Sequence, residues 1–383
     1  MNGICRCLAS CAMGYVLLAC QSALLSAELP ASLGKDWPLF RGDPQSTGVY
    51  HGQLPAKLEL VWKFAVAKGA FESTATIVDG TAYIGDLDGM VFALDLGRGA
   101  KRWQHKTEAG FMASPAIRDG LLYLGDLDGS FYCLDAVTGT RRWTFKSEAE
   151  IDSSANFFRD NVLVGSQDAS LYCLNAKTGA LAWKHTIGDQ IRCTPTIVAD
   201  RVFLAGCDSR LHVVDLNNGQ TAAEVEIGAP TGVTPAVQGD FVYFGTEGGE
   251  FLCVNWKAAK VVWTYRPEDG SQPYRSSAAV LGEQVVVGSR NKRVQSLNAQ
   301  TGQLQWSFAA RQRVDSSPVL VGDRVFVGSS DGRVYGLSLK TGQKIWEYEA
   351  GGGFSGSPAV ADGRLVIASS DGVVYCFGEK KGP

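Results

Sequence analysis

The chain has 383 residues, of which 45% are hydrophobic and 20% are charged, so its composition is that of a globular protein and not of a disordered one. The formal net charge of −3 and the lack of a lysine- or arginine-rich patch argue against nucleic acid as a partner. The 45 glycines, together with few stretches of helical periodicity, indicate many tight turns and an all-β fold.

Residues 1–27 predict an export signal, because one early basic residue, Arg6, is followed by a short apolar core and then by small residues. The core is shorter than the roughly twenty residues that span a membrane. The sequence LLAC, which ends at Cys20, resembles a bacterial lipobox and predicts acylation of Cys20. Cleavage after Ala27 would instead release a soluble protein. We favour the lipobox, since Leu25 is larger than the residue preferred three positions before a cut at Ala27.

Residues 28–55 form a lead-in, and a repeat of about forty residues occupies residues 56–379. One tryptophan marks each copy, except that Ala223 fills this position in one copy without a shift of register. Most of these positions follow a turn of the type Thr138-Gly139. A repeat of this length indicates a modular architecture. The marking tryptophans are Trp62, Trp103, Trp143, Trp183, Trp263, Trp306 and Trp346.

Each repeat contains four short segments with the pattern of β-strands. In one copy the first segment follows Ser114-Pro115 and ends at the turn Asp119-Gly120. The apolar runs LLYLG and SFYCLD come next, and the fourth segment carries the tryptophan. Two-residue polar turns between such runs favour an up-and-down meander. Four strands in about forty residues are typical of one blade of a β-propeller.

The number of segments predicts how the ring closes. Eight sets of the first three segments begin near Thr74, but the tryptophan segment around Trp62 precedes the first set, and none follows the last set. We therefore predict a single eight-bladed propeller of four-stranded antiparallel blades over residues 56–379. The N-terminal strand around Trp62 completes the last blade and covers an otherwise open edge. Residues 380–383 would be a short tail.

The motif Asp-Ala-x-Thr-Gly-x-x-x-Trp at residues 135–143 resembles the tryptophan-docking repeat of PQQ-like, quinoprotein-type β-propellers. That family includes quinoprotein dehydrogenases and BamB-type lipoproteins of outer-membrane protein assembly, and the chain is most similar to the latter. The segment WPLFRGDPQSTGV at residues 37–49 resembles the entry segment of many of these proteins. The resemblance implies the fold and the docking tryptophans, but one fold hosts many activities.

The polar residues within the repeat do not indicate a metal or catalytic site. Calcium needs six to eight oxygen ligands, and the carboxylates of the Asp86–Gly89 turn are missing from other copies, so we interpret this turn as a hairpin turn. Cys193 and Cys207 lie on neighbouring strands, and the sequence leaves open whether they form a disulfide. We predict no cofactor, since PQQ has no supporting motif here. Four cysteines share a position with small residues and are expected to pack: Cys133, Cys173, Cys253 and Cys376.

A ring of charged residues is the strongest candidate site. These residues stand two positions before the Ser or Thr that opens each inner strand, where the loops of a propeller gather around one mouth of the channel. They would receive a ligand or a loop of a partner, or else they pair with neighbouring loop charges. The charged members are Glu72, Asp152, Arg192, Arg275 and Asp315.

These observations predict a non-catalytic scaffold of the cell envelope that assists outer-membrane protein assembly. The protein would be exported to the periplasm, anchored to the outer membrane through Cys20, monomeric, and bound to a protein partner. One alternative is an enzyme of the quinoprotein dehydrogenase type, for which the resemblance implies a quinone, calcium, a catalytic Asp and adjacent cysteines. The chain has no Cys-Cys pair. A propeller that binds sugars or other small ligands is the other alternative.

Overall fold

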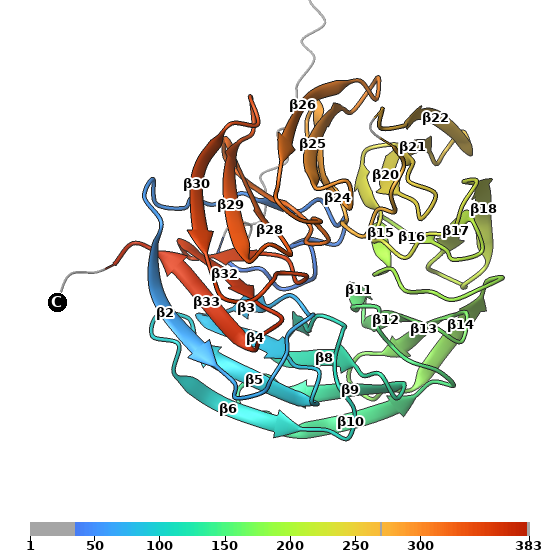
Figure 1. The fold of residues 1–383 in the computed structure, drawn as a ribbon. Coiled ribbons are helices and arrows are strands. Elements are labelled where there is room, and N and C mark those ends of the chain that lie inside the picture. Colours follow the sequence, from blue (N-terminus) through green and yellow to red (C-terminus); the bar gives the residue numbers. More distant parts are fainter. Residues whose placement is uncertain (1–34, 269, 381–383) are drawn as a thin grey trace, which may run out of the picture. The chain divides into compact units, whose positions relative to one another are not determined.

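The computed structural model describes residues 35–268 and 270–380. The predicted export signal and Cys20 therefore lie outside the described residues. Within them, no helix has the length and hydrophobicity needed to cross a membrane. The described chain is all β, and its strands form eight antiparallel blades arranged in a ring (Figure 1). The predicted eight-bladed propeller is confirmed.

The blades are numbered in chain order, and each has four antiparallel strands that run from the inside of the ring outward. Blades 1 to 4 are β3 (Thr76–Val78), β4 (Thr81–Gly85), β5 (Met90–Asp95) and β6 (Lys101–Lys106); β7 (Ala116–Arg118), β8 (Leu121–Gly125), β9 (Ser130–Asp135) and β10 (Arg141–Lys146); β11 (Asn156–Phe158), β12 (Asn161–Ser166), β13 (Ser170–Asn175) and β14 (Leu181–Thr186); and β15 (Thr196–Val198), β16 (Arg201–Ala205), β17 (Arg210–Asp215) and β18 (Thr221–Glu226).

Blades 5 to 8 follow the same order, and the last takes its outermost strand from the N-terminal part of the chain. They are β19 (Ala236–Gln238), β20 (Phe241–Gly245), β21 (Phe251–Asn255) and β22 (Lys260–Tyr265); β23 (Ala279–Leu281), β24 (Gln284–Ser289), β25 (Arg293–Asn298) and β26 (Leu304–Ala309); β27 (Val319–Val321), β28 (Arg324–Gly328), β29 (Arg333–Ser338) and β30 (Lys344–Glu349); and β31 (Ala359–Ala361), β32 (Arg364–Ala368), β33 (Val373–Gly378) and β2 (Glu59–Ala65).

The ring closes as predicted, because β2 pairs antiparallel with β33 and places Trp62 opposite Cys376. In Figure 1 the blue β2 lies along the red β33. Middle strands such as β9 are buried over four successive residues, since both of their faces pack against neighbouring blades. Outer strands such as β10 alternate between exposed and half-buried residues. This difference in burial explains why the repeat combines continuous apolar runs with one alternating segment.

The tryptophans connect each blade to the next. The indole Nε1–H of Trp103 donates to the carbonyl of Ala136, at 2.9 Å, and its ring packs on Gly139. Gly139 has a φ of 72°, and a Cβ atom there would lie 2.7 Å from the ring of Trp103, so the turn before the next tryptophan requires glycine. Trp183 packs in the same way on Gly219. Equivalent indole-to-carbonyl bonds join Trp62 to Leu96, Trp143 to Ala176, Trp263 to Ala299, Trp306 to Leu339 and Trp346 to Leu58.

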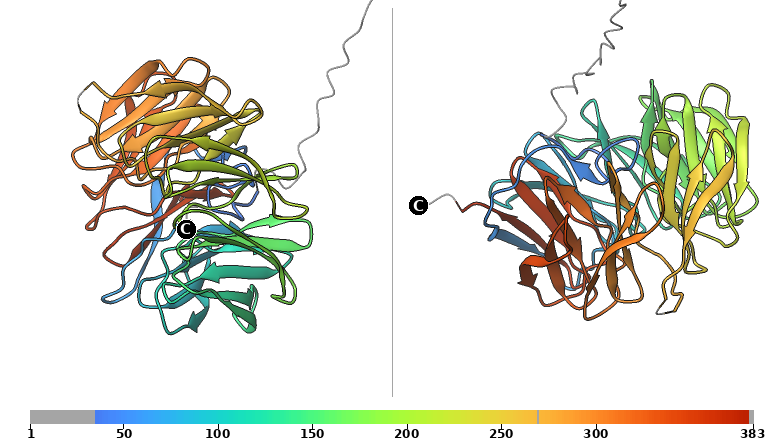
Figure 2. Two further views of the ribbon diagram at one scale, coloured as in Figure 1. Left: turned by 90° about the vertical axis from the view of Figure 1, so that its right-hand side faces the viewer. Right: turned by 90° about the horizontal axis from the view of Figure 1, so that it is seen from above.

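The lead-in passes the inner strands of successive blades at the end of the channel opposite the predicted mouth. Trp37 exchanges two backbone hydrogen bonds with Ile77 of β3, at 2.7 and 2.9 Å. Further along, β1 (Val49–Tyr50) pairs parallel with β27 as a fifth strand of blade 7. The blue segment that carries β1 lies at one face of the ring (Figure 2). Between these points, lead-in carbonyls accept the backbone N–H groups of Ile117, Ile197, Val237, Val280 and Leu320.

Candidate functional site: the channel mouth

A ring of hydrogen bonds links the residues that open the inner strands. In each such bond a backbone N–H donates to the Ser or Thr hydroxyl oxygen of the following blade, at 2.9–3.0 Å. The last bond runs from Ser357 to Thr74 and so joins blade 8 to blade 1. The hydroxyls are buried, and these seven bonds hold the loops around the mouth in place. The other donor–acceptor pairs are Thr74–Ser114, Ser114–Ser154, Thr194–Thr234, Thr234–Ser277, Ser277–Ser317 and Ser317–Ser357.

The mouth opens into a small cavity of about 150 Å³ that the hydroxyl ring and the charged loops share. Phe40 of the lead-in also lines it. A cavity of this size accommodates one inserted side chain rather than a large ligand. The structure brings all five charged residues of the predicted site to this cavity: Glu72, Asp152, Arg192, Arg275 and Asp315.

Asp152 is the most perturbed group at the mouth. Burial raises the pKa of its carboxyl to about 6, although the nearby guanidinium of Arg192 acts in the opposite direction. One carboxyl oxygen accepts a hydrogen bond from the amide of Gln167, at 3.1 Å, while the other is buried and has no protein partner among the described residues. Arg192 donates to Gln190 at 3.0 Å. Asp152 therefore has an oxygen left for a group that enters the mouth.

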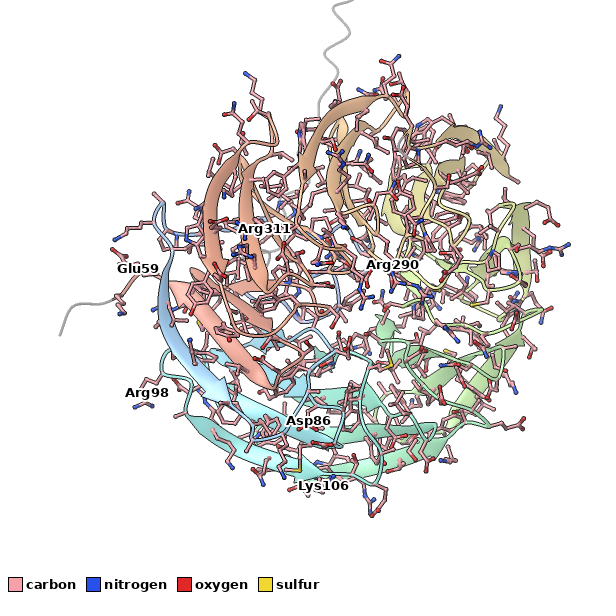
Figure 3. All side chains as sticks on the ribbon, in the orientation of Figure 1. Glu59, Asp86, Arg98, Lys106, Arg290 and Arg311 are labelled. Atoms are coloured by element: carbon pink, nitrogen blue, oxygen red, sulfur yellow. The ribbon has the colours of Figure 1, made fainter. Side chains whose placement is uncertain are left out.

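The remaining charges of blades 5 to 7 pair with one another. Arg275 lies 3.1 Å from Glu247. Arg290 makes two parallel hydrogen bonds of 2.9 Å to Asp315, and Arg313 lies 3.3 Å from the same carboxylate. Two-pronged bonds of this kind fix both side chains. In Figure 3 the labelled Arg290 lies toward the middle of the ring, whereas Arg98 lies at the periphery.

The rim therefore has two chemically different sides. Glu72 and Asp152 place carboxylates on blades 1 and 3, with the exposed Met112 between them on blade 2. On blades 6 and 7, Arg290 and Arg313 surround Asp315. A partner loop could bring a donor group and an apolar contact to the first side and an acceptor to the second.

Sequence reasoning missed the partners of these charges. Glu247, Arg290 and Gln167 occupy one equivalent position in the turn between the second and third strands. The sequence pattern predicts only a hairpin turn there, and the contrast among Glu, Arg and Gln at one position is the signal that indicates a further role. This position faces the loop before the inner strand, so charge variation there indicates pairing at the mouth.

The cysteines and the aspartate turns that the sequence singles out do not form a catalytic or metal site among the described residues. Cys193 and Cys207 are both free thiols, which settles the open question of a disulfide between them. Burial raises the pKa of Cys193 to about 12, so it stays protonated at neutral pH. An oxygen of Asp86 accepts the backbone N–H groups of Asp88 and Met90, as expected of a turn. Within residues 35–268 and 270–380, no three His, Cys, Asp or Glu side chains are grouped so as to hold a metal ion.

A quinone cofactor with its calcium ion does not fit the mouth. The cavity of about 150 Å³ is smaller than the roughly 300 Å³ at which ligand sites begin. Its carboxylates are separated by hydroxyls or paired with arginines, so they do not supply the six to eight oxygens that calcium needs.

Comparison with solved structures shows the same fold in proteins of different activity. BamB from Moraxella catarrhalis is 22% identical, with a TM-score of 0.72, over 86% of this chain and 99% of that one. The computationally designed protein Ika8 is 17% identical, with a TM-score of 0.75, over 84% of this chain and 100% of that one. A europium-containing methanol dehydrogenase is 13% identical, with a TM-score of 0.78, over 90% of this chain and 98% of that one. Identities this low establish the fold alone.

The sequence itself is more specific than these structures. A comparison with curated protein sequences found no significant match. The family model for the outer membrane protein assembly factor BamB matches residues 56–159, 148–225 and 207–383, and so covers the whole propeller. The chain belongs to the family of the outer membrane protein assembly factor BamB.

Proposed function

We propose that this protein is a non-catalytic scaffold of the cell envelope that assists outer-membrane protein assembly by docking a protein partner at its channel mouth. The observation that carries the proposal is the family match over the entire propeller, with no part of residues 56–383 left unmatched. The predicted export signal and acylation of Cys20 agree with a site of action at the outer membrane.

The mouth supplies the features that docking needs. Its loops are held by the hydroxyl hydrogen bonds and by ion pairs, so they lose little conformational entropy when a partner binds. Met112 is 45% exposed, which makes it an apolar contact next to the available oxygen of Asp152. Central apolar contacts within a polar rim are typical of protein interfaces.

The experiment is site-specific photo-crosslinking in cells that carry the full-length protein. A photoreactive residue replaces Met112 at the mouth or, as a control, Leu181, which is similarly exposed on the outer strand β14. We expect position 112, and not position 181, to cross-link to a component of the outer-membrane assembly machinery that mass spectrometry identifies.

Two results would contradict the proposal. Equal cross-linking from both positions would show that the mouth is not a specific interface. Quinone-dependent oxidation of an alcohol by the purified protein would instead support the dehydrogenase alternative, whose fold it shares. Separately, Cys20→Ala should release the protein from the membrane fraction, and retention of this variant would refute the lipid anchor.

A further inference from the structure

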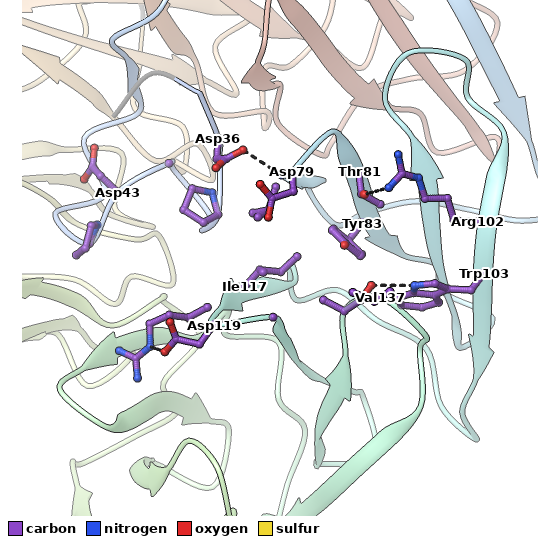
Figure 4. Close-up of a pocket in the computed structure, with 17 residues that line it drawn as sticks. Asp36, Asp43, Asp79, Thr81, Tyr83, Arg102, Trp103, Ile117, Asp119 and Val137 are labelled. Carbon is purple, nitrogen blue, oxygen red and sulfur yellow. Dashed lines mark hydrogen bonds and ion pairs between the residues drawn. The ribbon is translucent and has the colours of Figure 1, made fainter. Parts of the chain in front are cut away.

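A second cavity lies between blades 1 and 2, at the face opposite the mouth (Figure 4). The inner strand of blade 2 runs from one site to the other. Ser114, just before this strand, lines the mouth, and Asp119, just after it, lines the second cavity. Its volume of about 720 Å³ lies in the range of ligand-binding sites. We call it the blade 1–2 pocket. Its apolar wall consists mainly of Pro38, Val78, Tyr83, Trp103, Ile117 and Val137.

The pocket is open because it lacks the large side chains that fill two other junctions between blades. Between blades 2 and 3, the guanidinium of Arg118 lies 4.4 Å from the centre of the Phe157 ring, and Phe157 packs against Tyr123. Val78 and Ile117 hold the equivalent positions between blades 1 and 2. They are shorter, so the junction is left unfilled.

The junction between blades 4 and 5 shows the same contrast. There Trp256 packs against Phe203, with ring centres 5.4 Å apart. Ala136 occupies the position of Trp256 at the blade 1–2 pocket. Alanine also holds this position in blades 3 and 6, as Ala176 and Ala299, so the junction between blades 1 and 2 is open because it lacks both large pairs of the other two junctions.

Tyr83 brings a buried polar group to the pocket wall. The equivalent hydroxyls of Tyr123 and Tyr243 donate to the carbonyls of Ala176 and Ala299, at 3.0 and 3.3 Å. The Tyr83 hydroxyl instead interacts with Thr81, and the residue is 5% exposed. Figure 4 draws Tyr83 beside Thr81 on the pocket wall. Its hydroxyl is therefore placed to donate to a carbonyl group of a ligand.

The rim of the pocket is acidic. Four aspartates and two arginines line it, which leaves a net charge of −2 when all are ionised. Burial raises the pKa of Asp43. Arg102 is occupied by Asp95, at 2.8 Å, and by the hydroxyl of Thr81, at 2.7 Å. The lining aspartates are Asp36, Asp43, Asp79 and Asp119.

We propose that the blade 1–2 pocket docks a basic peptide segment of a partner protein that carries one bulky apolar anchor residue. The anchor fills the space between Val78 and Ile117, which Arg118 and Phe157 fill at the equivalent junction between blades 2 and 3. Flanking lysines or arginines approach Asp79 and Asp119 on the rim, since opposite charges complement each other across an interface. This inference does not depend on the proposed role of the mouth, because the two sites lie at opposite ends of the strands.

The test uses the full propeller and fluorescein-labelled peptides of the sequences KKFKK, KKGKK and EEFEE. Fluorescence anisotropy measures affinity, and the NMR signal of the Trp103 indole N–H, which donates to Ala136, reports the location of binding. We expect KKFKK to bind at least about tenfold more tightly than either of the other peptides, to shift the Trp103 signal and to weaken with added salt.

Two variants keep the fold while they change the pocket. Asp79→Asn with Asp119→Asn removes two charges, and asparagine tolerates the positive φ of both residues, 48° and 54°. Val137→Lys replaces an apolar residue that is 80% exposed by the lysine that blades 3 and 7 have at this position. We expect each to weaken KKFKK binding by about tenfold. Asp362→Asn, at the same turn position of blade 8 with a φ of 46°, is the control and should not change it.

The proposal fails if KKFKK binds no more tightly than KKGKK, or if binding is the same in the pocket variants and in Asp362→Asn. A shift of signals from the mouth without a shift of Trp103 would place the peptide at the mouth and would also overturn this inference. Because the mouth residues are unchanged in all of these variants, failure here leaves the crosslinking result at Met112 unaffected.

Discussion

The two ends of the propeller channel are built in different ways. At the mouth, all eight blades contribute the same element, a Ser or Thr at the start of the inner strand, and in seven of them its hydroxyl accepts a hydrogen bond from the preceding blade. At the other end a single non-repeated segment, residues 37–50, bonds in turn to the inner strands of most blades. The mouth thus follows the symmetry of the repeat, whereas the opposite end depends on residues that occur once.

This difference teaches where variation is tolerated. The hydroxyl hydrogen bonds at the mouth are equivalent and do not involve the charged side chains. The charges of the rim can therefore differ from blade to blade while these bonds hold the loops in place. The lead-in has no second copy, and its residues are correspondingly buried: Trp37 and Arg41 are each 1% exposed. Arg41 donates to the carbonyls of Ala278 and Pro318, which belong to neighbouring blades.

The largest expected effect is at the lead-in. Trp37→Ala should lower the free energy of unfolding by about 3–5 kcal/mol, because it removes a fully buried tryptophan that packs on Gly42. Urea denaturation followed by circular dichroism measures this loss. The half-buried Trp256 is the matched control, and Trp256→Ala should cost less. Equal losses would show that the lead-in is no more important than one blade junction.

The next effect concerns the repeated contacts between blades. Gly139→Ala should cost about 2–3 kcal/mol, since its Cβ would lie 2.7 Å from the Trp103 ring and its φ of 72° strains any non-glycine residue. Gly120 has the same φ of 72° but no atom within 4 Å of the added Cβ. Gly120→Ala should therefore cost only about 1 kcal/mol. Indistinguishable denaturation midpoints for the two variants would argue against tight tryptophan docking.

At the mouth we expect a pH-dependent effect. The folded-state pKa of Asp152, about 6, lies above the usual value of about 3.9, so the folded state favours the protonated carboxyl. The wild-type protein therefore loses stability as the pH rises between these two values, by up to about 2 kcal/mol. Asp152→Asn should be more stable than wild type at pH 7, and this gain should disappear at pH 4. A gain that is the same at both pH values would exclude ionisation of Asp152 as its cause.

The smallest expected effect is in the rim ion pairs. A double-mutant cycle with Asp315→Asn and Arg290→Gln should give a coupling of about 1 kcal/mol, because the pair is partly buried and has two hydrogen bonds. The more exposed pair of Arg142 and Asp135, 2.6 Å apart, should give about 0.5 kcal/mol or less. A larger coupling in the exposed pair would contradict the view that the mouth is pre-ordered.

Most residues of the candidate site could be predicted by aligning the repeats of the sequence. Glu72, Asp152, Arg192, Arg275 and Asp315 stand at one repeat position, and a propeller necessarily brings one position of every blade to one height on the channel. Their binding role remains a prediction. The partners of these charges did not follow, because Glu247 and Arg290 stand in turns of the preceding blades, distant in sequence from Arg275 and Asp315, and their contacts across blades depend on loop conformation.

The sequence by itself determined the blade count, the antiparallel order of strands and the closure of blade 8 by the strand around Trp62, since each depends on local periodicity and on a count of segments. Only the tertiary structure decided the path of the lead-in, the raised pKa of Asp152 and the open junction between blades 1 and 2. Each of these depends on contacts between residues that are distant in sequence. Such contacts decide how completely a junction between blades is filled and how far a carboxyl group is shielded from water.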